Sequence, residues 1–416
     1  PGHGSDGGGA GSRCRGDLRL RRRGGGWVLN TAKRHFVLVA GEASGDVLGA
    51  RLIAALRQRH DPRNGDLEFS GVGGALMAAQ GLDSLFPIAD LSVMGLAEIL
   101  PRLPLLLRRL SETAAHVSAV QPTALITIDA PGFSFRLAKR LKGQGFPLIH
   151  YVAPQVWAWR PGRARHLAGR IDHLLALLPF EPAFFSDYDL PCDFVGHPVI
   201  EGVAEAPGDG AAFRLARGIA PDAPVLALLP GSRVGEASRL LPVFAEVAAR
   251  LHAQRPGLEI VLPTVEAVAA TVAEAVRPWS VPTHIVKDGG ERADAFAAAD
   301  AALAASGTVS LELALRGIPT VVAYRTNPVT AALVRRMLTI PHVALPNILA
   351  GSEVVPEFLQ ENCRAEPIAA ALAKLLDDPA RRAAQKTELA HIAELLGRGG
   401  TAPSLRAADA VLKVIA

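Results

Sequence analysis

The 416-residue sequence contains little cysteine, few aromatic residues and almost no excess of charge of either sign. The three cysteines, Cys14, Cys192 and Cys363, are odd in number and far apart. They provide neither a disulfide framework nor a thiolate metal site, which favours a reducing compartment. Much of the formal net charge of +4 lies in one early cluster, Arg13 to Arg23. The rest of the chain is nearly balanced, so we expect no nucleic-acid partner.

Long apolar runs are also missing. Proline and arginine interrupt the strongest candidate for a membrane span, residues 96–110. The first thirty residues are rich in glycine and arginine and lack the apolar region of a signal peptide. The chain starts at Pro1, and we expect residues 1–33 to be a disordered or non-native extension. These absences favour a cytoplasmic protein.

Hydrophobic residues, by contrast, make up 49% of the chain, enough for a large core. From residue 34 onward, short apolar runs alternate with longer amphipathic stretches, which predicts parallel sheets covered by helices on both faces. The runs that read as buried strands are 35–40, 67–72, 124–129, 147–152 and 173–178, and then 225–230, 258–263, 283–288, 301–305 and 319–324.

The series of strands restarts after a segment rich in Ala, Gly, Pro and Asp, which predicts two doubly wound, Rossmann-like α/β domains facing a central cleft. We place the first domain at residues 34–200, a linker at 201–224 and the second domain at 225–395. Residues 396–416 are predicted to form a helix that returns to pack on the first domain.

Two strand-end loops of the first domain carry candidate site residues. In the turn at 41–46, two glycines allow close backbone approach, and Ser44 and Asp46 could cap the next helix. The alternative is a well-built turn with no ligand. Asp129 follows another strand, where a carboxylate facing the cleft is typical of a general base. The alternative for Asp129 is a cap of the helix expected near Ser134.

Further along, Trp157 and Trp159 lie in a loop with Gln155, either as a sugar-stacking wall or as core. His197 precedes the linker and could face the cleft, the alternative being a packing or hydrogen-bonding residue. Asp187 and Asp189 superficially match a metal-binding D-x-D motif. They follow a short helical stretch rather than a strand end, so we interpret them as a surface turn and expect no metal.

In the second domain, two strand-end loops have the chemistry of anion sites. The first loop combines backbone amides with a hydroxyl and a guanidinium, which suits a pyrophosphate; its residues are Gly231, Ser232 and Arg233. The second loop suits a phosphate, and its residues are Ser306, Gly307 and Thr308. Glu312 lies one helical turn after Thr308 and suits a ribose diol, the alternative being a solvated surface carboxylate. Two anion sites in one domain favour a nucleotide diphosphate.

The segment at 91–110 is strongly apolar with interspersed arginines. Such a helix can lie on an anionic membrane surface or contact acyl chains, and the alternative is a buried core helix. The expected contact residues are Met94, Leu96, Leu105, Leu106, Leu107, Arg102, Arg108 and Arg109.

Taken together, several long motifs in order resemble the lipid-A-disaccharide synthase family. They are GEASGD (41–46), SVMGLAEILPRL (92–103), IDAPGFS (128–134), HYVAPQVWAWRPGR (150–163), LPFE (178–181), FVGHP (194–198), LLPGSR (228–233), SGTVSLE (306–312) and LPNILAG (345–351). The resemblance implies a GT-B fold and an inverting transfer without metal or cofactor. UDP-2,3-diacylglucosamine would be the donor and 2,3-diacylglucosamine 1-phosphate the acceptor. The product would be a β-1,6-linked lipid A disaccharide 1-phosphate, with UDP released.

By the same resemblance, Asp129 would be the base, Arg233 the pyrophosphate contact and Glu312 a nucleotide contact. The residues expected near donor or acceptor sugar are Ser44, Gly45, Asp46, Gln155 and Asn347. The protein would lie peripherally on the inner membrane, and a homodimer is compatible with the sequence. Two rivals remain at this point: another GT-B enzyme, such as a UDP-sugar epimerase or a cell-wall glycosyltransferase, and a non-catalytic sugar-nucleotide or membrane-binding protein.

Overall fold

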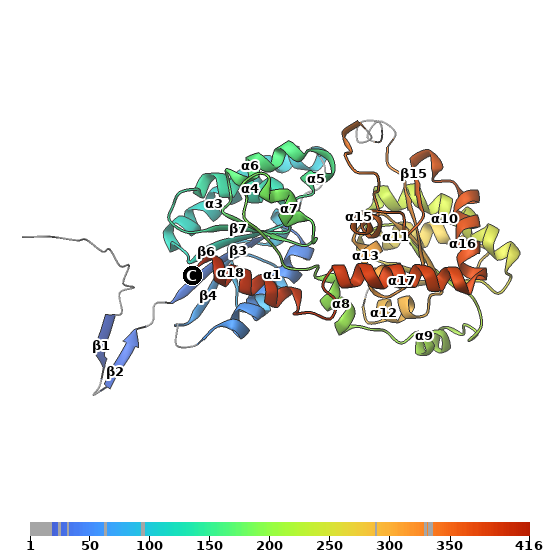
Figure 1. Cartoon of the computed structure of the whole chain (residues 1–416), viewed down its shortest axis with the longest axis horizontal. Helices are drawn as coiled ribbons and strands as arrows, with labels where there is room; N and C mark the ends of the chain where they lie inside the picture. The colour runs from blue at the N-terminus through green and yellow to red at the C-terminus, as the bar shows by residue number, and fades with distance from the viewer. Residues whose placement is uncertain are drawn as a thin grey trace, which may run out of the picture.

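The computed structural model describes residues 19–23, 26–30, 33–61, 65–92, 96–287, 289–327, 331 and 336–416. These residues form two α/β halves that lie side by side (Figure 1). Ahead of them, β1 (Arg19–Arg23) pairs with β2 (Gly26–Asn30) as an antiparallel ribbon. This ribbon falls inside the segment expected to be a disordered or non-native extension.

The first half contains a parallel sheet of seven strands in the order β5-β4-β3-β6-β7-β8-β9. The strands are β3 (Arg34–Ala40), β4 (Leu67–Val72), β5 (Asp83–Ser84), β6 (Ala124–Ile128), β7 (Leu148–Tyr151), β8 (His173–Ala176) and β9 (Cys192–Phe194). The helices are α1 (Ala43–Arg59), α2 (Ala75–Ala79), α3 (Leu96–Val120), α4 (Pro131–Leu141), α5 (Val156–Trp159), α6 (Ala164–Ala168) and α7 (Glu181–Ser186). Short 3-10 turns are η2 (Ile88–Asp90) and η3 (Pro161–Arg163).

The second half contains a parallel sheet of six strands in the order β12-β11-β10-β13-β14-β15. The strands are β10 (Val225–Leu229), β11 (Glu259–Thr264), β12 (Thr283–Lys287), β13 (Ala301–Ala305), β14 (Thr320–Tyr324) and β15 (Glu357–Leu359). The helices are α10 (Val234–Gln254), α11 (Glu266–Val276), α12 (Glu291–Ala297), α13 (Thr308–Leu315), α15 (Leu345–Ala350), α16 (Ala365–Asp377) and α17 (Pro379–Leu395), with the turn η4 (Gln360–Asn362).

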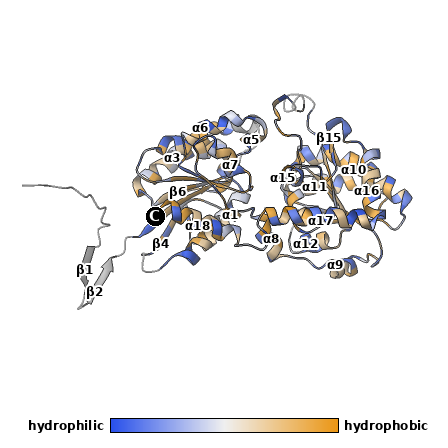
Figure 2. Cartoon of the chain, in the orientation of Figure 1, coloured by the Kyte–Doolittle hydropathy of each residue, from blue (hydrophilic) through white to orange (hydrophobic). Residues whose placement is uncertain are grey.

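The central strands are buried along their whole length, which explains their continuous apolar runs. Every residue of β6, β7, β10 and β13 is buried. Strands of a parallel sheet are covered by helices on both faces, so neither face of such a strand needs polar residues. Figure 2 shows the hydrophobic colour concentrated in the two sheets, while many of the helices alternate hydrophobic and hydrophilic positions.

Two crossings of the chain join the halves. The expected linker at 201–224 contains most of α8 (Val199–Glu205) and all of α9 (Gly210–Arg217). Phe213 of α9 and Ile219 beyond it belong to the core of the second half. At the other end of the chain, α18 (Pro403–Val414) packs along α1 of the first half (Figure 1). Ala407 and Val411 of α18 are fully buried against the first sheet, so the C-terminal helix is part of the first domain's core.

The predicted fold of two doubly wound parallel sheets is confirmed. Each predicted strand has a counterpart within two residues of its expected bounds. The structure adds β5, β9 and β15, which have only two or three residues each and therefore leave no periodic pattern to recognise.

Candidate active site

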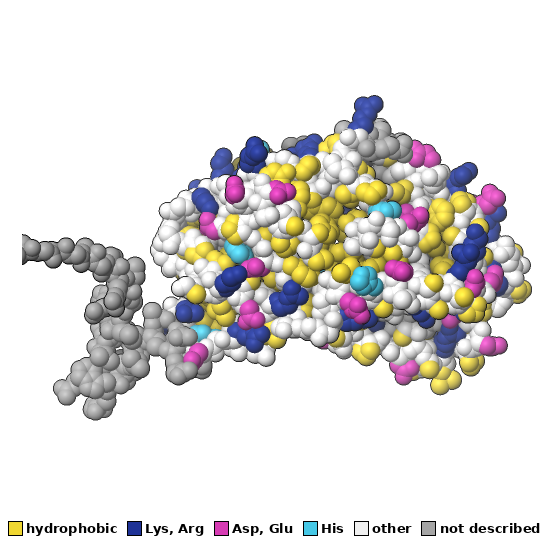
Figure 3. Space-filling view, in the orientation of Figure 1, with side chains coloured by type: hydrophobic (Ala, Val, Ile, Leu, Met, Phe, Trp, Pro, Cys, Tyr) yellow, Lys and Arg dark blue, Asp and Glu magenta, His cyan; other side chains and the backbone are white. Residues whose placement is uncertain are grey.

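A cleft of about 930 Å³ lies between the two halves. Loops at the carboxyl ends of strands line it from both sides, as expected for parallel α/β sheets. The first half contributes Asp129, Gln155 and His197, and the second contributes Arg233 and Thr308. In the space-filling view, hydrophobic side chains gather where the halves meet (Figure 3). The structure thus brings the predicted base and the predicted nucleotide loops to one cavity.

Asp129 lies directly after β6 in a left-handed backbone conformation, with φ of 51°. The Asp129 amide donates to the Tyr151 carbonyl oxygen at 2.9 Å. The Ser134 hydroxyl donates to the Asp129 carbonyl oxygen at 2.7 Å. Helix α4 begins at Pro131, earlier than expected, and has no side-chain cap. Asp129 is therefore not a helix cap, and its carboxylate has no hydrogen-bond partner in the part of the chain that the structure describes.

Glu42 is a site residue that the sequence reasoning missed. It occupies the N-cap position of α1, yet its side chain does not cap the helix. Burial raises the pKa of Glu42, the charge of Asp129 raises it further, and Arg233 of the other half lowers it. A side chain at Gly41 would collide with the Cβ of Ala130, so glycine is needed for the two loops to approach. The position of Glu42 two residues after the end of β3 was the only available signal.

Asp46, expected at a sugar, has a different role. Its carboxylate accepts hydrogen bonds from the amides of Gly74, Leu76 and Met77 at 2.8–3.0 Å. These are the amides at the start of α2, and Asp46 itself is only 6% exposed. Asp46 is buried and both of its oxygens cap α2, a helix distant in sequence, so we assign it a structural role rather than contact with a sugar or service as the base.

Ser44 and Gly45 differ from each other in exposure. Because α1 begins at Ala43, both residues lie in its first turn rather than before it. Ser44 is exposed and remains a candidate polar contact. Gly45 is buried, and a Cβ at this position would lie 3.2 Å from the Cβ of Ala40. Gly45 therefore lets α1 pack closely on the sheet.

The two tryptophans of the α5 segment separate into the two roles that the sequence left open. Trp157 is buried, and its indole nitrogen donates to the Glu181 carboxylate at 3.0 Å. Glu181 also accepts from the amides of Leu177 and Leu178, and burial raises its pKa to about 7. Trp159 is 40% exposed and lines the cleft together with the exposed Gln155. Trp157 is therefore core, and Trp159 is cleft wall.

His197 lines the cleft as a neutral hydrogen-bond donor. Burial lowers its pKa to about 4. The Val199 amide donates to its Nδ1 at 3.3 Å, so Nδ1 is an acceptor and the single proton of the neutral ring lies on Nε2. An imidazole in this tautomer can donate from Nε2 but cannot take a proton there. His197 is thereby unsuited to be the general base.

In the second half, the loop after β10 carries a cation at the start of α10. Gly231 has φ of +109°, and a side chain there would collide with the Glu236 carboxylate. Ser232 and Arg233 are exposed, and Arg233 is the N-cap of α10. Burial raises the pKa of Glu236, while Arg233 and a hydrogen bond from the Ser232 backbone lower it. The loop thus holds the Glu236 carboxylate beside the Arg233 guanidinium, and Arg233 borders the cleft.

The second predicted anion loop follows β13. Gly307 has φ of +154°, and the exposed Thr308 begins α13 and lines the cleft. Ser306 is partly buried, and its hydroxyl donates to the Val343 carbonyl oxygen at 3.2 Å. Glu312 is not solvated: it pairs with Arg292 at 2.8 Å and with Arg316 at 3.5 Å. Each Glu312 oxygen accepts one of these bonds, which leaves further lone pairs for a ribose.

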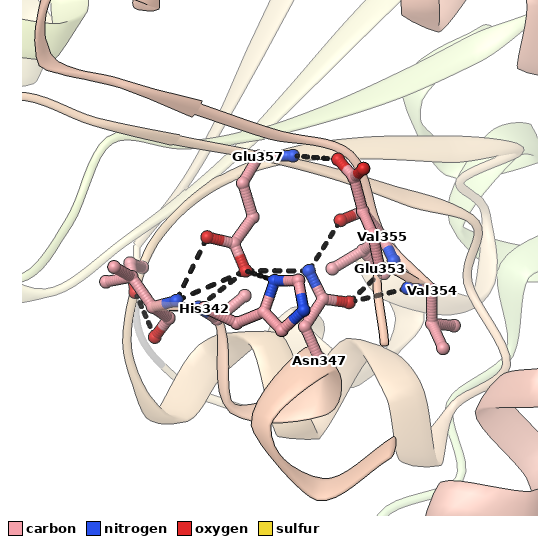
Figure 4. Close-up of polar contacts among 9 residues, drawn as sticks. His342, Asn347, Glu353, Val354, Val355 and Glu357 are labelled. Atoms are coloured by element: carbon pink, nitrogen blue, oxygen red, sulfur yellow. Dashed lines mark hydrogen bonds and ion pairs between the residues drawn. The ribbon is translucent and has the colours of Figure 1, made fainter. Parts of the chain in front are cut away.

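Asn347 was expected near a sugar, but its amide is fully used inside the second half (Figure 4). Its nitrogen donates to the Val355 carbonyl oxygen at 2.8 Å and to Glu357 at 2.6 Å. Its oxygen accepts from the amides of Val354 and Val355, both at 2.8 Å. With both donors and both lone pairs engaged and no exposed surface, Asn347 holds the loop after α15 and leaves the sugar-binding set.

The predicted membrane segment forms the first part of α3. Met94 lies outside the described residues, as does the side chain of Leu96. Leu107 is 50% exposed, and Arg102 and Arg108 are exposed. These three residues give the helix an apolar and basic outer surface.

Other residues of the same segment face inward. Leu106 packs against the core of the first half, and Leu105 is half-buried. Arg109 pairs with Asp90 and Glu112, both at 2.7 Å, and its guanidinium lies 4.5 Å from the centre of the Phe86 ring. Arg109 therefore holds α3 on the domain and is not available to a lipid head group.

The D-x-D sequence lies in a turn, as expected: Asp187 follows α7, and Asp189 has φ of 55°. Among the residues that the structure describes, no three His, Cys, Asp or Glu side chains are arranged to hold a metal ion. The described helices also include none with the length and apolar character that crossing a bilayer requires.

The two facing parallel-sheet domains and the interdomain cleft define a GT-B protein. Solved structures with this arrangement include UDP-GlcNAc 2-epimerase from Neisseria meningitidis bound to UDP-GlcNAc (TM-score 0.60, 12% identity, covering 91% of this chain and 98% of that one). MurG from Acinetobacter baumannii is similar as well (TM-score 0.55, 14% identity, covering 91% of this chain and 99% of that one). At these identities the likeness concerns the fold alone.

Sequence comparison is more specific. The family model described as lipid-A-disaccharide synthetase matches residues 36–410. The lipid-A-disaccharide synthase of Rhodospirillum centenum is 54% identical over 91% of this chain and 94% of its own length. That of Paramagnetospirillum magneticum is 50% identical over 91% of this chain and 97% of its own. The chain belongs to the lipid-A-disaccharide synthase family, whose members are glycosyltransferases of lipid A biosynthesis, and the expected resemblance is confirmed.

Proposed function

We propose that this protein transfers 2,3-diacylglucosamine from UDP to the 6-hydroxyl of 2,3-diacylglucosamine 1-phosphate. The product is the β-1,6-linked disaccharide 1-phosphate, and UDP leaves. The observation that carries the proposal is the meeting of Asp129 and Arg233, from opposite halves, in one cleft. An inverting transfer needs a base on one side of the anomeric carbon and a stabilised leaving group on the other.

Asp129 acts as the general base in this proposal. As the acceptor's 6-oxygen bonds to the anomeric carbon of the donor, its proton passes to the Asp129 carboxylate and the bond from that carbon to the UDP oxygen breaks. Three observations support this choice over its neighbours: Asp46 is engaged in capping α2, His197 carries its proton on Nε2, and the Asp129 carboxylate has no hydrogen-bond partner among the described residues. Glu42 is the nearest alternative, and its raised pKa is consistent with a carboxyl that shares the site.

The loops after β10 and β13 bind UDP. Arg233 and the amide of Gly231 offset the charge that develops on the departing diphosphate. Thr308 contacts a phosphate, and Glu312 accepts from the ribose while Arg292 and Arg316 hold its carboxylate. This arrangement supplies the required positive charge from the protein, so we expect transfer to persist in EDTA.

The protein associates peripherally with an anionic membrane through the outer surface of α3. Leu107 supplies apolar contact, and Arg102 and Arg108 attract lipid head groups. The substrates of the proposed reaction carry acyl chains and reside in a bilayer. A surface of this kind beside the cleft domain brings the enzyme to them at the cytoplasmic face of the inner membrane.

The test is UDP release and disaccharide formation measured with donor alone, acceptor alone and both together. The proposal expects UDP release only when both lipids are present. A UDP-sugar epimerase, suggested by the solved structures of similar fold, would act on the donor alone. Donor conversion without acceptor would therefore reject the transferase proposal in favour of that second candidate.

A further inference from the structure

A second set of basic side chains lines the cleft, on the opposite domain from the nucleotide loops. Arg163, His166 and Arg170 all border this cavity. They lie in and beside α6, at spacings of three and four residues. Only His166 lies within α6 itself, while Arg163 precedes the helix and Arg170 follows it, and all three side chains border the same cavity.

These groups have no acidic partner. Elsewhere in the chain arginines such as Arg109 and Arg214 form ion pairs with carboxylates. Within the residues that the structure describes, no Asp or Glu pairs with Arg163, His166 or Arg170. Basic side chains that border a cavity without an acidic partner are available to an anionic ligand.

One of the arginines is held in place by an aromatic ring. The guanidinium of Arg163 lies 5.6 Å from the centre of the Trp159 ring, which also lines the cleft. A cation–π contact of this kind orients the guanidinium without using its N–H donors. Arg163 is therefore ordered toward the cavity with its hydrogen-bonding capacity intact.

The proposed reaction places two anionic groups in the same cleft. The donor carries a diphosphate, for which the second domain supplies Arg233. The acceptor carries a phosphomonoester at its anomeric carbon, which the ring oxygen separates from the carbon that bears the 6-hydroxymethyl group. Two such anions in one cavity repel unless each has its own cations.

We propose that Arg163, His166 and Arg170 bind the phosphomonoester of the acceptor sugar. This inference rests on the proposed function and assigns the acceptor's charged end to the α6 side of the cleft. With its phosphate held there, the ring extends toward Asp129, which borders the same cavity. The site gives the enzyme a means to select a sugar phosphate as acceptor and to fix which hydroxyl reaches the base.

The test compares Arg163→Gln/Arg170→Gln with Arg165→Gln. Arg165 is an exposed arginine of the same helix that does not border the cleft, so it controls for loss of surface charge. Acceptor KM is measured at saturating donor in detergent micelles, with the phosphorylated acceptor and with its analogue lacking the phosphate. Charge-assisted hydrogen bonds contribute about 1.5–3 kcal/mol, so the double variant should raise KM for the phosphorylated acceptor by about tenfold or more.

The expected pattern is specific to a phosphate site. The double variant loses the wild-type preference for the phosphorylated acceptor, keeps its UDP affinity and donor KM, and recovers part of the preference as Arg163→Lys/Arg170→Lys. The Arg165→Gln control behaves as wild type. An unchanged acceptor KM overturns the proposal. So does a shift in donor KM or UDP affinity, which would assign the arginines to the donor, and so does an effect confined to binding of anionic vesicles.

A binding measurement separates this inference from the proposed reaction. Glucosamine 1-phosphate is titrated into wild type and variants in the absence of donor. Binding to wild type that the double variant loses and the control keeps supports the site even if no disaccharide is formed, a result that would count only against the transferase proposal. Equal binding of glucosamine 1-phosphate by all three proteins rejects the site.

Discussion

Replacing Asp129 with asparagine isolates its basicity from its structural role. Asp129 has a left-handed φ of 51°, and its backbone makes hydrogen bonds with Tyr151 and Ser134. Asparagine tolerates this conformation and keeps both backbone bonds. Alanine would add the cost of a left-handed backbone, about 1–2 kcal/mol, and would confuse stability with catalysis. The melting temperature of Asp129→Asn should therefore stay close to that of wild type.

The expected loss of turnover follows from the role of a general base. Such a base contributes about 10²- to 10⁴-fold in rate, equivalent to about 2.7–5.4 kcal/mol of activation free energy. Asp129→Asn should lose turnover in that range at saturating concentrations of both lipids. Its UDP affinity, measured by isothermal titration, should be unchanged, because Arg233 and its loop in the other domain remain intact.

The matched control is Glu42→Gln, since Glu42 lies close enough to Asp129 for the Asp129 charge to raise the pKa of Glu42. If Asp129→Asn keeps most of its turnover while Glu42→Gln loses it, the base is Glu42 and the assignment to Asp129 is wrong. The closeness of Asp129 and Glu42 also gives a prediction for the pKa of Glu42. Because Asp129 raises the pKa of Glu42, removing its charge should lower that pKa, which can be followed by ¹³C NMR of labelled glutamate.

Three further predictions concern other parts of the protein. Arg233→Gln should weaken UDP binding by about ten- to a hundredfold through loss of a charge-assisted contact, and an unchanged dissociation constant would remove the second domain as the nucleotide domain. Leu107→Ser should reduce sedimentation with anionic vesicles and leave the melting temperature unchanged, because Leu107 is 50% exposed; Leu106→Ser, which alters a core contact, should instead lower that temperature. Burial raises the pKa of Glu181 from 4.5 to about 7, so the folded state holds this proton more tightly than the unfolded state. Between these two pH values, wild type should lose about 3 kcal/mol of stability relative to Glu181→Gln as pH rises, measured by urea unfolding, and parallel pH curves would contradict the assignment.

Sequence alone was sufficient for the architecture and for the loops that line the cleft. Buried parallel strands need apolar residues at every position, and this local pattern is visible without knowledge of partners. The strand ends then indicate where ligands bind, which is how Asp129 and Arg233 were found although 104 positions separate them (233 − 129). The family motifs added the chemistry of the substrates, which periodicity and spacing cannot specify.

Only the tertiary structure decided which polar side chains in those motifs are left to face the cleft and which are hydrogen-bonded inside the fold. Asp46 and Asn347 stand in the same motifs as the site residues, yet their hydrogen bonds go to amides and carbonyls brought to them by folding. Glu42 became a site residue because the loop at Gly41 packs against Ala130, a contact between segments far apart in the sequence. Local sequence determines the element to which a side chain belongs. Whether that side chain is satisfied inside the fold or left facing the cleft depends on packing between elements, and local sequence does not encode this.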